Sequence, residues 1–71
     1  MTQAMRDAIL AAIPAGTDHA IRQREIWKRA GQVGVESSFG TYLFELTASG
    51  EVKRRRHPIP TGFVWLYWRE A

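Results

Sequence analysis

The spacing of apolar residues changes at Gly50, and this change constrains the fold more than any other feature of the sequence. Before Gly50, apolar residues recur at intervals of four, four and three, which is the stripe of an amphipathic helix over about residues 36–49. They are Val35, Phe39, Leu43 and Leu46. After Gly50 the period is two, and residues 63–68 are rich in aromatic side chains. The sequence therefore predicts an α+β domain in which helices precede a β-hairpin.

Two shorter helices are predicted in the first half of the chain. Thr2 is a suitable N-cap for a helix over about residues 3–13, and Pro14 ends this helix because proline lacks a backbone donor. A second helix begins at residue 23 or 24 and ends at Gly31, which suits a left-handed C-terminal cap. The order of elements is then three helices followed by a two-stranded hairpin.

Two short segments flank the second helix. Residues 19–22 are compatible with a short extra strand and with an extended entry into the helix. Residues 32–35 are predicted to form a turn, in which Gly34 can adopt a positive φ. Because the chain has only 71 residues, we expect a single domain over residues 1–71 with one small core.

The hairpin is predicted to begin at Val52 and to return through residues 63–68. Pro58 and Pro60 cannot donate to a strand ladder, so residues 57–62 are predicted to form the connecting loop.

The amino-acid composition narrows the class of protein. The chain has no cysteine, so its stability must come from packing or oligomerisation. The longest apolar run, residues 8–13, is far shorter than the ~20 residues of a membrane-spanning helix, and the N-terminus does not resemble a secretory signal. We therefore expect a soluble cytoplasmic protein without membrane contact, associated with the nucleoid if it is bacterial or phage-derived.

The segment "REIWKRAG … SSFGTYLFELTASGEVKR" resembles the winged helix-turn-helix family. The resemblance rests on a helix ending in glycine, a turn, a recognition helix with a fixed apolar spacing, and a hairpin called the wing. The residues that carry this spacing are Phe39, Leu43, Leu46, Gly50 and Val52. The resemblance covers about residues 19–68 and implies a scaffold rather than a function, since winged helices also serve as protein-docking modules. This chain departs from the family pattern in having no lysine or arginine in the recognition helix.

Positive charge is gathered in two zones. The net charge is +3, and the cations cluster in residues 19–35 and 51–57, on either side of an acidic segment. This distribution favours a polyanionic partner but is also compatible with a solvated face.

The predicted wing holds the strongest candidates for DNA binding. Strand alternation places Lys53 and Arg55 on one face and Arg54 and Arg56 on the other, which is the face of the apolar Val52. We therefore expect Arg54 to be partly tucked beside the core, with its head reaching solvent. At the hairpin end this alternation should relax, so that the remaining cations reach a duplex backbone or an A·T-rich minor groove. These candidates are Lys53, Arg55, Arg56 and His57. The alternative is an edge strand protected by charge against aggregation.

The two helices of the helix-turn-helix supply further candidates. The first helix of such a pair crosses the DNA backbone, so phosphate contacts are predicted for Arg22, Arg24 and Lys28, with solvated surface as the alternative. In the recognition helix, the hydroxyls of Ser37, Ser38 and Thr41 can bind phosphates or base edges, and Gly40 allows close backbone approach. The alternative for the serines is that they cap the helix.

The aromatic residues of the return strand are predicted to form much of the core, because each aromatic side chain buries a large area. They are Phe63, Trp65, Tyr67 and Trp68, together with Trp27 of the second helix. Both faces of the return strand are apolar, so one face should meet something other than the helices. A homodimer or another protein partner is preferred, with exposed aromatic surface as the alternative.

No arrangement of residues indicates catalysis. The two histidines are isolated and the seven carboxylates are scattered beside cations, so we expect no enzyme activity, metal, cofactor or small-molecule substrate. The sequence favours a double-stranded DNA-binding protein, either a small transcriptional regulator or an architectural accessory factor, and its small size suits a phage or mobile element. The alternative is a winged-helix interaction module that does not bind DNA.

Overall fold

The first helix, α1 (Gln3–Ala12), begins where the sequence predicts and ends one residue earlier. The computed structural model describes residues 1–32 and 34–70. The hydroxyl of Thr2 accepts a hydrogen bond from the Met5 backbone N–H at 3.1 Å, which caps the helix as expected. At Ile13 the backbone is already extended, directly before Pro14.

The segment before the second helix is a strand. After the short 3₁₀ helix η1 (Thr17–His19), strand β1 (Ile21–Arg22) pairs with the return strand of the hairpin and leads directly into α2 (Gln23–Arg29). Of the two arrangements compatible with the sequence, the extra strand is therefore the one that forms. Gly31 follows α2 with a φ of 83°, as its predicted role in the C-terminal cap requires.

The third helix is divided at its start. Residues Glu36–Ser38 form the 3₁₀ helix η2, and the α-helix α3 covers Phe39–Ala48. In the turn before it Gly34 has a positive φ of 68°, as predicted, while Val33 lies outside the described residues.

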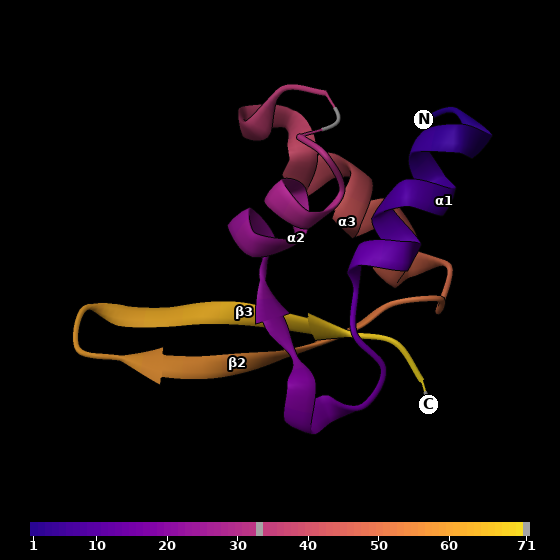
Figure 1. Cartoon of the computed structure of the whole chain (residues 1–71). Coiled ribbons are helices and arrows are strands. Elements are labelled where there is room, and N and C mark those ends of the chain that lie inside the picture. Colours follow the sequence, from indigo (N-terminus) through magenta and orange to yellow (C-terminus); the bar gives the residue numbers. More distant parts are fainter. Residues whose placement is uncertain (33, 71) are drawn as a thin grey trace.

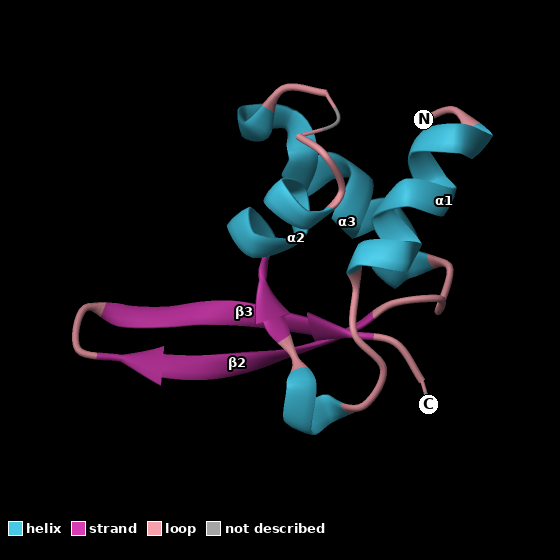
Figure 2. Ribbon diagram, viewed as in Figure 1, coloured by secondary structure: helices cyan, strands magenta, loops and turns pink. Residues whose placement is uncertain are grey.

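The sheet has the order β1-β3-β2 and is antiparallel throughout. Strands β2 (Lys53–Ile59) and β3 (Gly62–Trp68) form a long hairpin, with β3 at the centre of the sheet. Figure 1 shows that α1, α2 and α3 all lie on one side of the sheet and that the hairpin extends well beyond them. The pairing of β2 and β3 continues without interruption along this extension (Figure 2).

The prediction of a loop over residues 57–62 is wrong. Pairing continues through Pro58 opposite Phe63 and Ile59 opposite Gly62, which leaves Pro60 and Thr61 as the turn. Proline is accommodated because β2 is an edge strand. Hydrogen-bonded and non-hydrogen-bonded pairs alternate, so the pair next to the one that closes the turn needs no donor from Pro58.

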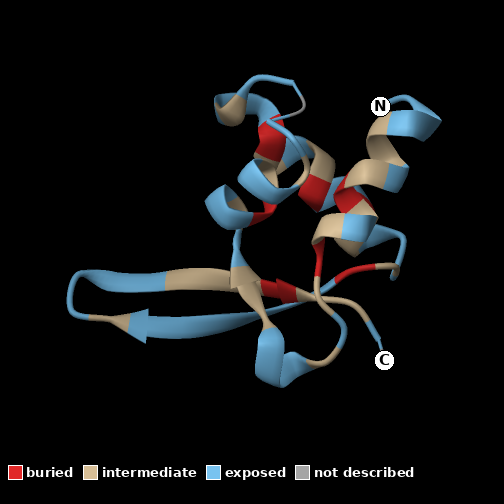
Figure 3. Cartoon of the chain, viewed as in Figure 1, coloured by how far each residue is buried: buried red, intermediate tan, exposed pale blue. Residues whose placement is uncertain are grey.

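The core forms where the helices meet the base of the hairpin (Figure 3). It consists of Ile9, Ile13, Ile26, Phe39, Leu43, Leu46, Val52 and Tyr67. Each α-helix contributes apolar residues, and Val52 and Tyr67 come from the base of the hairpin. Of the predicted stripe of the third helix, Phe39, Leu43 and Leu46 are buried, but Val35 lies before η2 and is 65% exposed, so its prediction is wrong.

The aromatic residues contribute less to the core than predicted. Of the five, only Tyr67 is buried; Trp27, Trp65 and Trp68 are half-buried, and the side chain of Phe63 is exposed. For Phe63, next to the turn, the reason is geometric, since the outer part of the hairpin lies beyond the helices that could cover it (Figure 1).

Within the described residues the chain is thus an α+β fold of three α-helices and a three-stranded antiparallel sheet, an arrangement compatible with a winged-helix-like architecture. None of the helices in this part of the chain has the length and apolar character needed to cross a bilayer.

Candidate nucleic-acid interface

The wing, defined as the hairpin of residues 53–68, has two distinct faces. Directly paired residues of neighbouring antiparallel strands share a face. The inner face, toward the helices, carries Arg54 opposite the buried Tyr67 and Arg56 opposite Trp65. The outer face, away from the helices, carries Lys53 opposite Trp68, Arg55 opposite Leu66, and His57 opposite Val64. The cations of the wing are therefore divided between its faces.

This division corrects two predictions. Alternation does not relax near the hairpin end, because pairing is regular up to Ile59. Arg56 therefore faces away from Arg55 and His57 instead of joining them. Arg54 lies on the predicted face but is exposed rather than partly buried beside the core.

On the inner face, arginines and aromatic rings alternate in a stacked row. The Arg54 Cζ atom lies 4.1 Å from the ring centroid of Trp65. The Arg56 Cζ atom lies 4.7 Å from the centroid of Phe63 and 5.7 Å from that of Trp65. The rings of Phe63 and Trp65 meet edge to face, with centroids 5.5 Å apart. We call these four residues the inner-face stack. Cation–π contact of this kind restricts a guanidinium group without consuming its N–H donors.

The outer face combines cations with a strip of apolar side chains. Val64, Leu66 and Trp68 are half-buried there and lie on the side of the sheet opposite the helices. Arg22 of β1 pairs with Leu66 and so adds a further cation to this face. Lys53 Nζ lies 3.6 Å from the Glu70 carboxylate in an exposed ion pair.

Charge on α2 is partly neutralised. Arg24 Nε lies 3.5 Å from a carboxylate oxygen of Glu36, so this candidate for phosphate contact already has an anionic neighbour. Lys28 is exposed and has no salt bridge to any carboxylate in residues 1–32 and 34–70. Of the helix-two candidates, Lys28 is therefore more available to phosphate than Arg24.

The N-terminal part of the predicted recognition helix leaves its three candidate hydroxyls in solvent. Ser37, Ser38 and Thr41 are all exposed. The Ser38 side chain makes no capping hydrogen bond to α3, so the capping interpretation is wrong for this residue. Gly40 does not lie on the free face: a Cβ atom at this position would come within 3.3 Å of Gln23 Oε1, so the glycine serves the packing of α3 on α2.

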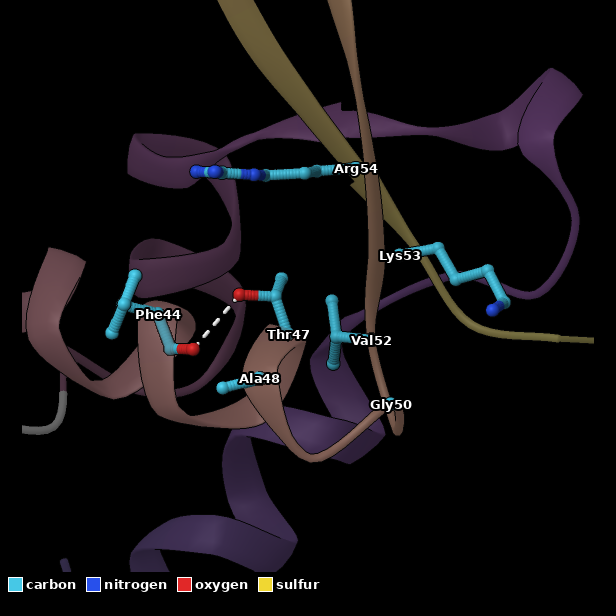
Figure 4. Close-up of a pocket in the computed structure, with 7 residues that line it drawn as sticks. All are labelled: Phe44, Thr47, Ala48, Gly50, Val52, Lys53 and Arg54. Carbon is cyan, nitrogen blue, oxygen red and sulfur yellow. Dashed lines mark hydrogen bonds between the residues drawn. The ribbon is translucent and has the colours of Figure 1, made fainter.

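The exposed face of α3 is apolar where it approaches β2. The side chain of Phe44 is 62% exposed. It stands at the edge of a hollow of about 420 Å³ between the C-terminal half of α3 and the start of β2 (Figure 4). The hollow is lined by Phe44, Thr47, Ala48, Gly50, Val52, Lys53 and Arg54. Arg54 extends over it on the side of Phe44, whereas Lys53 points away.

Sequence reasoning overlooked Arg54 and Phe44 as candidate site residues. Arg54 follows the core residue Val52 by two positions, which predicted a partly buried side chain. The exposure of Arg54 could have been predicted from the length of the hairpin. That length follows only if Pro60–Thr61 is recognised as a two-residue turn.

In the described part of the chain, no three histidine or carboxylate side chains lie close enough together to hold a metal ion. Comparisons with models of protein families, with curated proteins and with solved structures found no match to this chain.

Proposed function

We propose that this protein is a winged helix-turn-helix protein that binds double-stranded DNA through the wing and α3. One observation carries the proposal: the hairpin extends beyond the helices and presents Arg54, Arg55 and Arg56 in exposed positions. None of the three forms a salt bridge with a carboxylate in residues 1–32 and 34–70. Exposed guanidinium groups on a projecting hairpin are suited to contact phosphates, whose neutralisation provides most of the affinity for DNA.

In the proposed complex, α3 enters the major groove and the wing follows the adjacent backbone. The exposed hydroxyls at the start of α3 contact phosphates or base edges, and Lys28 contacts the backbone beside them. If four or five phosphates are engaged, the logarithm of the affinity should fall against the logarithm of the salt concentration with a slope of about −4. A protein of this size would act as a small transcriptional regulator or as an architectural accessory factor.

A salt series of gel shifts on random-sequence duplex DNA tests the proposal. Binding near 50 mM salt that weakens steeply up to 200 mM is the expected result. Absence of a shifted band at 50 mM salt, with the protein shown to be folded by circular dichroism, would overturn it. Selection from a random pool of duplexes would then define the preferred sequence.

A protein-interaction module is the second candidate, and the apolar surface favours it. Phe44 is exposed on a cation-free α3, and Val64, Leu66 and Trp68 form a half-buried apolar strip on the outer face. Such a strip suits a second copy of the chain or another protein. Sedimentation equilibrium of the wild-type protein and of a Trp68→Ser variant tests for the second copy. If the wild type is a dimer and the variant is a monomer, the strip is a self-association surface.

A further inference from the structure

We infer that the hollow between α3 and β2 recognises the 5-methyl group of thymine in the major groove. This inference rests on the proposed function and adds a basis for sequence preference to it. Its starting point is that α3 carries no lysine or arginine, and so lacks the side chains that most often form specific hydrogen bonds to base edges.

Part of the lining of the hollow is suited to a methyl group. Phe44, Ala48 and Val52 contribute apolar side chains, beside the cations Lys53 and Arg54. The hydroxyl of Thr47 donates a hydrogen bond to the Phe44 carbonyl oxygen at 2.8 Å, so its polar end is occupied within the helix (Figure 4). Apolar contact with the thymine methyl is the form of base recognition that these side chains can provide.

The charge at the rim favours an anionic occupant such as DNA over a neutral apolar segment. The Arg54 guanidinium extends over the hollow on the same side as Phe44 (Figure 4) and stacks on Trp65 at 4.1 Å. Stacking limits the positions available to the guanidinium group and leaves its donors free. A thymine methyl in the hollow would therefore lie beside a cation positioned for a phosphate.

The test uses two pairs of 30-base-pair duplexes whose members differ only at C5 of the pyrimidine. The first pair is alternating dA·dT and alternating dA·dU, and the second is alternating dG·dC and its 5-methylcytosine counterpart. Both partners of each pair keep the same Watson–Crick hydrogen bonds. Burial of one methyl group should favour the methylated member by roughly fourfold.

The variant Phe44→Ala should abolish this preference while retaining most of the affinity, because it removes the largest apolar side chain of the hollow and no charge. Phe44 is exposed, so its truncation should leave the fold intact, which circular dichroism would verify. Val35→Ala is the matched control: Val35 is also exposed, at 65%, but does not line the hollow, and its variant should keep the wild-type preference.

The outcomes separate this inference from the proposed function. Equal affinity of the wild type for both members of each pair overturns methyl recognition but leaves DNA binding standing. An undiminished methyl preference in Phe44→Ala also overturns it, because the preference would then arise elsewhere. If no duplex binds at 50 mM salt, both the inference and the proposed function fall.

Discussion

The two ends of the hairpin share one continuous strand ladder but lie in opposite environments. At the base, Val52 and Tyr67 are almost completely buried against all three helices. From Lys53, the residue after Val52, to Pro58, every residue of β2 is exposed, and so is Phe63 on the other strand. A single pair of strands thus passes from the core to a projecting cationic surface within a few residues.

The comparison shows how a small chain can separate stability from surface chemistry. An isolated two-stranded hairpin is marginally stable in water, so the outer part of the wing depends on the anchorage of its base. The outer part has no buried core. Its side chains instead contact one another in the inner-face stack of Arg54, Trp65, Arg56 and Phe63. Substitutions at the base should therefore affect unfolding, and substitutions farther out should affect binding.

The largest effect is expected at the base. Tyr67→Ala removes a buried aromatic ring from the central strand, and truncations of this kind cost about 3–5 kcal/mol of the free energy of unfolding. Since small domains have little stability to lose, the variant should be largely unfolded at 37 °C. Urea denaturation followed by circular dichroism measures the change.

Phe63→Ala provides the comparison on the same strand. Phe63 is half exposed, so its truncation should cost less than about 1 kcal/mol, mainly the lost contacts with Arg56 and Trp65. Equal destabilisation by the two substitutions would mean that the outer part of the hairpin is as important for folding as the base, and the contrast between them would be lost.

The next largest effect is expected on the affinity for DNA. Arg55→Ala combined with Arg56→Ala removes one cation from each face of the wing. Under the proposed function the salt slope should flatten by about two, at about 0.9 per lost phosphate contact, and the loss of affinity should be largest at low salt. Fluorescence anisotropy on labelled duplexes at several salt concentrations measures both quantities.

Arg29→Ala is the control for a simple loss of net charge. Arg29 pairs with Glu25 on α2, with Nε and carboxylate oxygen 3.2 Å apart. Its removal should change the salt slope little. If the double variant of the wing binds as tightly as the wild type, the wing does not contact the backbone.

Much of the fold could be predicted from the sequence because it depends on local patterns. Periodicity located the helices, Thr2 and Gly31 marked two of their ends, and Gly50 marked the change to strands. The length of the hairpin was not predictable in the same way. Proline is unfavourable within most strands, and only the position of β2 at the sheet edge, a property of the whole fold, makes Pro58 acceptable.

The arrangement of the candidate site was predicted less completely, for a related reason. The division of the wing cations between two faces followed from alternation along the strand, and the structure confirms it. That this alternation continues to Ile59 could not be predicted, because it depends on where the turn lies. The position of the Gln23 side chain beside Gly40 likewise depends on the packing of two helices, which cannot be deduced from the spacing of either.

A smaller effect tests the inner-face stack itself. In a double-mutant cycle, Arg54→Ala and Trp65→Leu should show a coupling of about 0.5–1 kcal/mol in the free energy of unfolding, because each removes the same cation–π contact. Arg55 lies on the opposite face, so the cycle of Arg55→Ala with Trp65→Leu should give a coupling near zero. Similar couplings in both cycles would show that the stack contributes nothing specific to the outer hairpin.

The smallest effect is expected at the boundary between the two ends. Glu70→Gln removes the partner of Lys53 from an exposed ion pair, so the free energy of unfolding should change by less than about 0.5 kcal/mol. DNA affinity should nevertheless rise by about two- to threefold at 20 mM salt, because one carboxylate near the phosphates is lost, and the gain should disappear at high salt as screening increases. Anisotropy titrations at both salt concentrations measure this difference. An affinity that is unchanged at 20 mM salt would place Lys53 outside the interface and confine DNA contact to the part of the wing beyond it.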